Sequence, residues 1–199
     1  GLAFINPASS SEWNLVHDED VKVFTRTKEG ARVSELRAEI EMDCAPSEAR
    51  SVLIDDDYTK RTPYVSEARI VEQPSRKTKI KYTRLAFPVV NDRDYFIEVT
   101  READLDAKGT GTYLTKWKSW DVLQPVPDAT VRVTTVEGYW KIEPGARRGQ
   151  SKVVYYLHFD PGGNIPGWLV NMGNKRVMPD VLKSLYKEIL RRREIAQHK

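Results

Sequence analysis

The sequence predicts an α+β fold, because segments with strand character fill the middle of the chain and a long helical segment follows them. The strand-like segments are rich in β-branched and aromatic residues, and turns rich in Gly, Pro and Asp separate them. Strands that succeed one another without an intervening helix pair as an antiparallel sheet. These segments cover 67–72, 78–86, 94–102, 112–120, 131–142 and 151–159.

The N-terminal part adds two further strands and short helical pieces. Residues 1–11 predict an irregular arm, and 13–16 predict one helical turn that ends at the acidic run 18–20. The pattern then predicts strands over 21–27 and 33–42, a helix from Pro46 to about Ile54, and a polar connector over 58–64. Three consecutive aspartates at 55–57 lack the spaced oxygen ligands of a cation loop, so we expect no metal there.

A long amphipathic helix is predicted from about 164 to 193. Asn164 suits an N-cap and Pro166 suits the first turn. The apolar residues recur at three- and four-residue steps with one slip, and Pro179 lies at that slip, so a bend is expected. This face closes a core or roofs an apolar cavity, and it comprises Trp168, Leu169, Met172, Met178, Leu182, Leu185 and Ile189.

Composition favours one domain over residues 1–199, with 40% hydrophobic and 31% charged residues. No apolar run reaches the roughly 20 residues of a membrane span. We therefore expect a soluble monomer of the cytoplasm, or of the periplasm if a leader was removed. Cys44 is the only cysteine and three histidines are scattered, so the sequence predicts no metal, no cofactor and no catalytic motif.

Positive charge gathers at the C-terminal end of the chain. Residues 175–199 hold eight Lys or Arg against three acids, a local charge of +5 within a total of +3. Such a helix end either contacts anionic membrane lipids transiently or forms a solvated outer face. No aromatic-basic repeat accompanies the charge, so nucleic acid is not an expected partner.

The start of this helix carries a family resemblance. The run Asp-Pro-Gly-Gly-x-Ile-Pro-x-Trp-Leu-x-Asn over 160–171, followed by Lys175, Pro179 and Leu182-Lys183, resembles the last helix of START (StAR-related lipid transfer) domains, nearest their phosphatidylcholine-transfer branch. The resemblance implies a helix-grip fold, in which a curved antiparallel sheet wraps around a long kinked C-terminal helix and encloses a lipid-sized tunnel.

The loop over 85–91 is unusually apolar for a connection between strands. Phe87-Pro88 followed by Arg93-Asp94-Tyr95 is similar to the START loop that covers the tunnel mouth and contacts the membrane. Arg93 has two interpretations: it binds a lipid phosphate through its planar guanidinium, or it forms a structural ion pair with Asp92 or Asp94.

Aromatic residues of three strands, namely Tyr113, Trp117, Trp120, Tyr139, Trp140, Tyr155 and Tyr156, form either a cage for a quaternary ammonium or the core of the sheet. Asn171 is polar on the apolar helix face and either binds a headgroup or satisfies a backbone group. The complete set of predicted ligand-binding residues is Arg93, Phe87, Val89, Tyr113, Trp117, Tyr155, Trp168, Leu169, Asn171, Met172, Met178 and Leu182.

The resemblance implies non-enzymatic binding or transfer of one lipid, gated by the 85–91 loop and the helix. Sterol-binding members carry a buried arginine six residues after the Arg of the Arg-Asp pair, where this chain has Val99, which disfavours a sterol. Two alternatives remain open. One is a helix-grip enzyme of cyclase or hydrolase type that uses Glu39 or His158 on an aromatic or polyketide substrate. The other is a ligand-gated interaction module.

Overall fold

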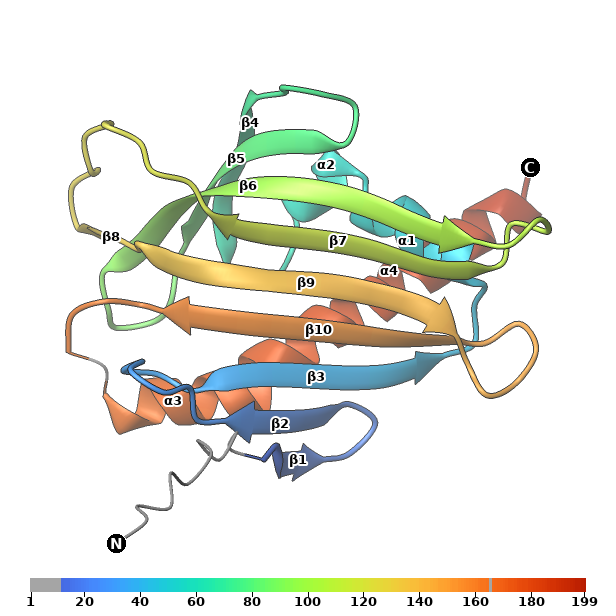
Figure 1. The fold of residues 1–199 in the computed structure, drawn as a ribbon, viewed down its shortest axis with the longest axis horizontal. Coiled ribbons are helices and arrows are strands. Elements are labelled where there is room, and N and C mark those ends of the chain that lie inside the picture. Colours follow the sequence, from blue (N-terminus) through green and yellow to red (C-terminus); the bar gives the residue numbers. More distant parts are fainter. Residues whose placement is uncertain (1–11, 165) are drawn as a thin grey trace, which may run out of the picture.

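The computed structural model describes residues 12–164 and 166–199, and the arm predicted at 1–11 lies outside these ranges. Within them, one ten-stranded sheet curves around a long C-terminal helix (Figure 1). The strand order is β1-β2-β3-β10-β9-β7-β6-β5-β4, and each neighbouring pair along this path is antiparallel. The predicted α+β class and the helix-grip arrangement are confirmed.

The strands alternate inward and outward side chains, as the sequence pattern predicts. In β3, Ala38 and Met42 are fully buried while Glu41 is exposed. The bounds are β1 Asn14–Asp18, β2 Lys22–Arg26, β3 Glu35–Met42, β4 Val65–Glu72, β5 Thr78–Leu85, β6 Asp92–Leu105, β7 Gly111–Ser119, β8 Thr130–Arg132, β9 Thr135–Pro144 and β10 Ser151–Asp160.

Two predictions about strands were wrong. Residues 13–16 do not form a helical turn, because 14–18 pair with β2 as the edge strand β1. The strand predicted over 131–142 is divided into β8, which pairs with β6 in parallel, and β9. The amide of Val133 donates to the carbonyl of Asp94 at 2.8 Å, which holds the chain against β6 before it turns into β9.

Two short helices precede the sheet-rich part: α1 at Pro46–Leu53, as predicted, and α2 at Asp56–Thr59. The three aspartates have structural roles. The Asp55 side chain accepts the N–H of Asp57 and so caps α2, which replaces part of the predicted connector. The two oxygens of Asp56 accept hydrogen bonds from Lys79 and Lys81 of β5.

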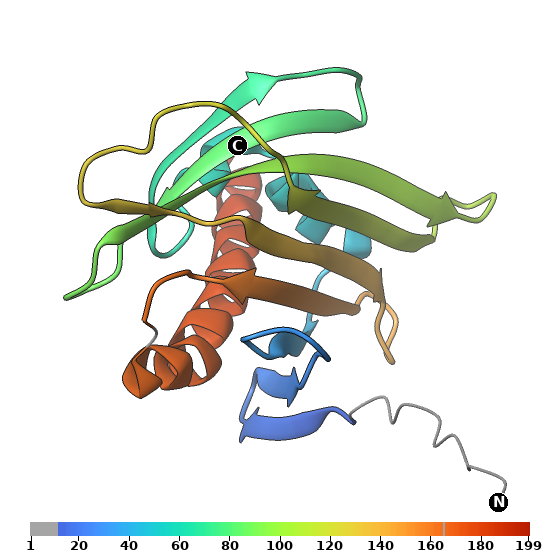
Figure 2. The same cartoon turned by 60° about the vertical axis from the view of Figure 1, so that its left-hand side comes forward.

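The C-terminal helix contains a π-helical segment at the slip in the apolar pattern. It comprises α3 Gly167–Met172, the π-helical η1 Gly173–Val177 and α4 Met178–Gln197. The N–H of Met178 donates to the carbonyl of Gly173, five residues earlier. The extra residue changes the phase of the apolar face where Pro179 has no N–H to donate. The first turns accordingly bend away from the axis of α4 (Figure 2). Asn164 is not the N-cap, since the helix begins at Gly167 after Pro166.

Only part of the helix packs into the core. Leu182 and Leu185 are fully buried, in one cluster with Val23, Ala38 and Val52. The helix therefore contacts the β2–β3 side of the sheet and α1. This helix does not cover the half of the sheet formed by β5, β6 and β7, where α1 packs against β7.

Ion pairs fasten the C-terminal turns to the body of the protein. The carboxylate of Glu188 is 6% exposed and accepts hydrogen bonds from Arg191 at 2.8 Å and Arg192 at 3.0 Å. Arg192 also pairs with Asp55, and Arg193 pairs with Glu48 of α1 at 3.0 Å. Hydrogen bonds from Arg191 oppose the effect of burial and, with Arg192, lower the pKa of Glu188 to about 2.

We predict that Glu188→Gln lowers the free energy of unfolding near neutral pH, and that this loss becomes smaller in acid. The folded-state pKa lies below the usual value of 4.5. The carboxylate therefore stabilises the fold fully above about pH 5, and this contribution is lost as the pH falls toward 2. Urea unfolding measures the free energy of unfolding of wild type and variant, and the difference between the two values should narrow steadily from pH 5 to pH 3. Glu194→Gln, at an exposed site on the same helix, is the control. A difference independent of pH would contradict the prediction.

Candidate ligand-binding cavity

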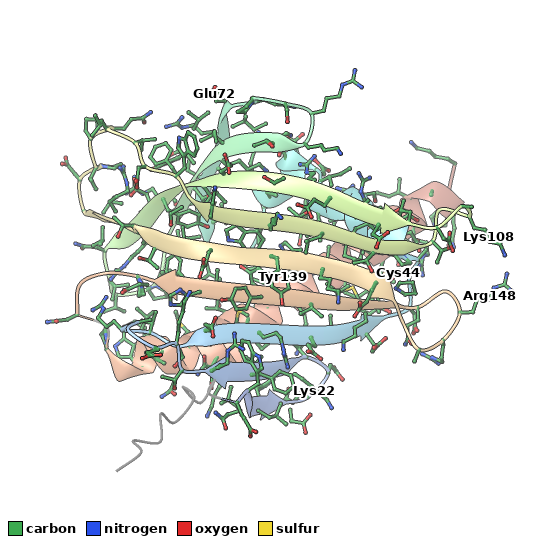
Figure 3. All side chains as sticks on the ribbon, viewed as in Figure 1. Lys22, Cys44, Glu72, Lys108, Tyr139 and Arg148 are labelled. Atoms are coloured by element: carbon green, nitrogen blue, oxygen red, sulfur yellow. The ribbon has the colours of Figure 1, made fainter. Side chains whose placement is uncertain are left out.

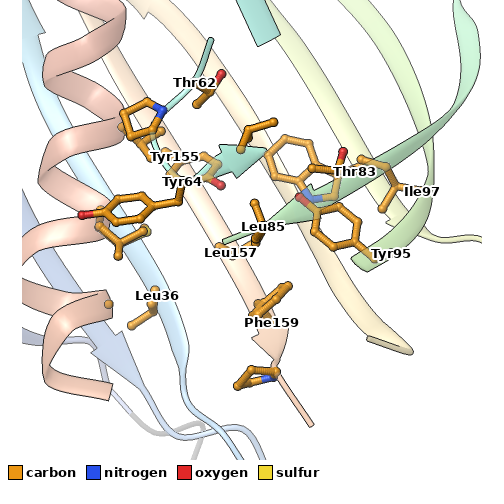
Figure 4. Close-up of a pocket in the computed structure, with 18 of the residues that line it drawn as sticks. Leu36, Thr62, Tyr64, Thr83, Leu85, Tyr95, Ile97, Tyr155, Leu157 and Phe159 are labelled. Atoms are coloured by element: carbon orange, nitrogen blue, oxygen red, sulfur yellow. The ribbon is translucent and has the colours of Figure 1, made fainter. Parts of the chain in front are cut away.

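A cavity of about 720 Å³ lies between the inner face of the sheet and the C-terminal helix. This volume is within the range of roughly 300–1,000 Å³ that is usual for ligand sites. Figure 4 shows Thr83, Tyr95 and Phe159 on the sheet side and Tyr64 beside the helix. Most of the lining side chains are aliphatic or aromatic.

The strands place side chains in the cavity by simple alternation. Every second residue of β6 lines it, from Tyr95 through Ile97 and Val99 to Arg101. Lys81, Thr83 and Leu85 of β5 do the same on the neighbouring strand. Burial raises the pKa of the Tyr95 hydroxyl to about 12, so this group stays neutral.

Three aromatic rings form one wall of the cavity. Trp140 and Tyr155 stack with ring centroids 4.3 Å apart, and Trp117 lies 5.8 Å from Tyr155. Gly138, opposite Trp117 in the register, makes this possible. A Cβ at Gly138 would lie 2.5 Å from the Trp117 ring and 2.3 Å from the Tyr156 carbonyl. The indole therefore lies over a strand that has no side chain at that point.

The aromatic residues divide between the two faces of the sheet. Tyr139 and Tyr156 stack at 5.0 Å on the face that lacks the cavity, where Figure 3 shows Tyr139 in front of the sheet. Trp13 packs edge-on against Tyr156 at 6.3 Å. A single cage that contains all the predicted aromatic residues is therefore excluded, because alternation sends neighbouring rings to opposite faces.

The helix closes the cavity with its first, bent half. Leu169 and Met172 of α3 line it, followed by Asn174 and Val177 of η1 and Met178 of α4. Beyond Met178 the inward side chains belong mainly to the core cluster. The π-helical segment thus separates the part of the helix that faces the cavity from the part that packs.

The loop between β5 and β6 lies at one end of the cavity and is linked to the helix. Phe87 lines the cavity and packs against Tyr64 with centroids 5.4 Å apart. The Tyr64 hydroxyl in turn donates to Asp180 of α4 at 3.0 Å. Val89 at the loop tip is 96% exposed and has a φ of 70°, a strained conformation for a β-branched residue.

Half of the residues predicted to bind ligand line the cavity: Phe87, Trp117, Tyr155, Leu169, Met172 and Met178. The others lie elsewhere. Trp168 is 45% exposed, Val89 projects into solvent, and Asn171 lies on the exposed side of α3. Leu182 is core, and Tyr113 packs on the core beneath the Arg50 guanidinium. The phase of α3 explains why Trp168 and Asn171 do not line the cavity. Leu169 and Met172, which follow them in the sequence, are the residues that face inward.

Arg93 does not form the predicted ion pair with Asp92 or Asp94. It is 4% exposed, and its guanidinium donates to the carbonyls of Pro161 at 3.1 Å and Asn91 at 2.5 Å. Asp92 pairs with Arg84, and Asp94 pairs with Arg132, each at 2.7 Å. Arg93 thus joins β6 to the segment that leads into α3 and is not among the residues that line the cavity.

The structure adds cavity residues that the sequence analysis missed. Arg32, Lys81 and Arg101 bring charge to the wall. Alternate residues of a strand face the same side of the sheet, so the inward positions of Ile97 and Val99 predict that Arg101 also faces the cavity. The proposed acid-base residues lie outside the cavity: Glu39 pairs with Arg37 at 3.1 Å, and His158 lies 3.5 Å from Glu137. In residues 12–164 and 166–199, no cluster of His, Cys, Asp or Glu could hold a metal ion, and no helix could span a membrane.

The START domain family model matches residues 7–194. The chain belongs to the START family. Its START domain is 30% identical over 146 residues to human phosphatidylcholine transfer protein, a match that covers 72% of this chain and 66% of that protein. An uncharacterized Pseudomonas aeruginosa protein is 29% identical over 171 residues, with 82% and 80% covered.

Solved START domains share the fold. The STAR-related lipid transfer protein of Xanthomonas axonopodis superposes with a TM-score of 0.74 at 26% identity, over 89% of this chain and 98% of that one. Human STARD10 superposes with a TM-score of 0.77 at 21% identity, over 94% of this chain and 76% of that one. Lipid binding is therefore the general property that family membership supports for this cavity.

We predict that Gly138→Ala disrupts the aromatic wall. The new Cβ collides with the Trp117 ring and the Tyr156 carbonyl, so the indole must move and the protein should lose about 1–3 kcal/mol of stability. Tryptophan fluorescence and urea unfolding measure the two effects. Gly167→Ala, where a Cβ meets nothing within 4 Å, is the control and should change neither. An unchanged emission spectrum in Gly138→Ala would contradict the wall geometry.

Proposed function

We propose that this START domain binds one lipid in the cavity and transfers it between membranes without chemical conversion, as a monomer and as one folded domain. The apolar wall between sheet and helix is the observation that supports this most directly. Burial of acyl surface contributes about 25 cal/mol per Å². The named activity of the phosphatidylcholine transfer proteins makes a phospholipid the natural first candidate.

We propose further that the 85–91 loop and the first half of the helix open together. Phe87 packs on Tyr64, and the Tyr64 hydroxyl donates to Asp180 in the first turn of α4, so the loop is linked to the helix directly after the π-helical segment. The π-helical segment is a weak point about which α3 can move. The ion pairs of Arg192 with Asp55 and of Arg193 with Glu48 hold the other end of the helix in place.

The membrane contact is proposed to be made by the loop tip. Val89 is almost fully exposed, and Trp168 and Val170 of α3 are 45% and 50% exposed. Exposed apolar side chains of this kind partition into a bilayer interface. The cluster of arginines at the C-terminal end is a less suitable contact, since Arg191, Arg192 and Arg193 are engaged in ion pairs within the fold.

Native mass spectrometry after incubation with mixed phospholipid vesicles tests the function. We expect an adduct of phospholipid mass, one per chain, and transfer of labelled lipid between vesicle populations. Thr115→Trp, which places an indole in the cavity, should reduce the adduct, whereas Thr112→Trp on the same strand should not. Thr115 lines the cavity and Thr112 does not. A protein that remains free of lipid under these conditions would overturn the proposal.

We predict that Val89→Glu slows transfer several-fold but leaves the amount of bound lipid unchanged. The charge opposes insertion of the loop tip into the bilayer, while the cavity itself is not altered. Vesicle-to-vesicle transfer of a fluorescent lipid measures the rate. Leu105→Glu introduces the same charge at the other end of β6, where the residue is 40% exposed, and should have no effect. Equal transfer rates for both variants would argue against docking through the loop.

A further inference from the structure

The charged residues of the cavity all have the same sign. Arg32, Lys81 and Arg101 line it, and in the part of the chain that the structure describes no Asp or Glu does. A mostly apolar cavity thus exposes these cations to its interior, while the acidic partners of Arg32 and Lys81, Asp160 and Asp56, are not among the lining residues. A buried cation is costly unless an anion or a set of hydrogen-bond acceptors compensates it.

Two of these cations meet at one place. The Lys81 Nζ donates to the Asp56 carboxylate at 2.6 Å, and the Arg101 Nη2 donates to the carbonyl of Ile54 at 3.3 Å. Their charged groups are therefore anchored only two residues apart, at the start of α2. Arg101 uses one of its five N–H groups in this contact, and the residue lines the cavity.

Asp56 cannot compensate both cations. Its other oxygen already accepts a hydrogen bond from Lys79, whose side chain is 12% exposed, and the Lys81 side chain is 13% exposed. Lys79, Lys81 and Arg101 therefore share one carboxylate. Burial lowers the pKa of both Lys81 and Arg101. The negative charge of Asp56 raises both pKa values, but by less than burial lowers them.

The paired cations lie at the end of the cavity away from the 85–91 loop. Lys81 is four residues before Leu85, where β5 ends at this loop. That separation is about 13 Å along a strand. Arg101 lies six residues beyond Tyr95 on β6, again away from the loop. A ligand with its polar group here would extend its apolar chains past Trp117 toward Phe87 and Leu169.

We infer that Lys81 and Arg101 form an anion-binding site at the deep end of the cavity, and that the preferred ligand is a lipid with a net negative headgroup. The recognised chemistry is a phosphate or carboxylate bound by charge-assisted hydrogen bonds. A zwitterionic headgroup fits less well, since no cavity carboxylate faces its ammonium and Trp140 and Tyr155 cover part of each other's ring faces. This inference rests on the proposed lipid-binding function.

Competition for the cavity tests the inference. The protein is incubated with vesicles that contain equimolar phosphatidylglycerol, phosphatidylcholine, diacylglycerol and oleate, and the bound species are identified by native mass spectrometry. We expect the anionic species to exceed phosphatidylcholine by about tenfold or more. Phosphatidylglycerol would identify the phosphate as the recognised group, and oleate would identify the carboxylate. Either outcome supports the anion site.

Variants separate this site from general effects on stability. Arg101→Gln and Lys81→Gln should reduce the preference to about twofold or less and still bind lipid. Lys79→Gln is the matched control. It removes a hydrogen bond to the same carboxylate, but Lys79 does not line the cavity, so the tenfold preference should persist.

Failure of the anion site and failure of the proposed lipid-binding function give different results. If the wild-type protein binds phosphatidylcholine or diacylglycerol in the same amount as the anionic lipids, the anion site is overturned, but the proposal of lipid binding stands. A preference that survives in both Arg101→Gln and Lys81→Gln would also overturn it. A wild-type protein that binds no lipid at all would overturn the proposed function, and the inference would fail with it.

Discussion

The architecture depends on a difference in width: the sheet is much wider than the single helix that packs against it. Adjacent strands are about 4.8 Å apart, and a helix with its side chains is about 10 Å across. A single helix can therefore cover only two or three of the strands that curve around it. Here it covers β2 and β3, and α1 packs beside it. The C-terminal helix does not cover the inner faces of β5, β6 and β7, so a mostly apolar cavity remains between these strands and the first half of the helix.

The helix performs two tasks because its apolar phase changes along its length. After Met178 it is an ordinary core helix, with Leu182 and Leu185 fully buried and with Arg192 and Arg193 paired with Asp55 and Glu48. Before Met178 it faces the cavity, with few packing partners of its own. The π-helical segment lies at the junction. A helix that is anchored at one end and weakly packed at the other suits a protein that must admit a large apolar ligand and close again.

The sequence predicted the main elements because alternation and helical periodicity are strong local signals. The β3 pattern and the β5-to-β10 succession depend only on residues close together in the chain. The division into β8 and β9 could not be predicted in this way, since it arises from a parallel pairing with β6 that is distant in sequence. The phase of α3 was also inaccessible, because the start of the helix differs from the predicted N-cap Asn164.

The candidate site was predictable only in its apolar part. Trp117, Tyr155 and the helix residues Leu169 and Met172 follow from periodicity once the fold is known. Charged residues are harder to assign, because the partners of a buried charge depend on tertiary contacts. For Arg93 the sequence allowed a phosphate or an acidic partner, whereas in the structure it donates to two backbone carbonyls. Arg101 was not among the predicted site residues, yet it lines the cavity.

The most direct test of this account is a crystal structure of the protein after incubation with lipid vesicles. The account predicts continuous density for acyl chains between Trp117 on the sheet and Met178 on the helix, with the polar group toward Lys81. A structure in which the lipid lies outside, while the sheet and helix close on each other and eliminate the cavity, would contradict it.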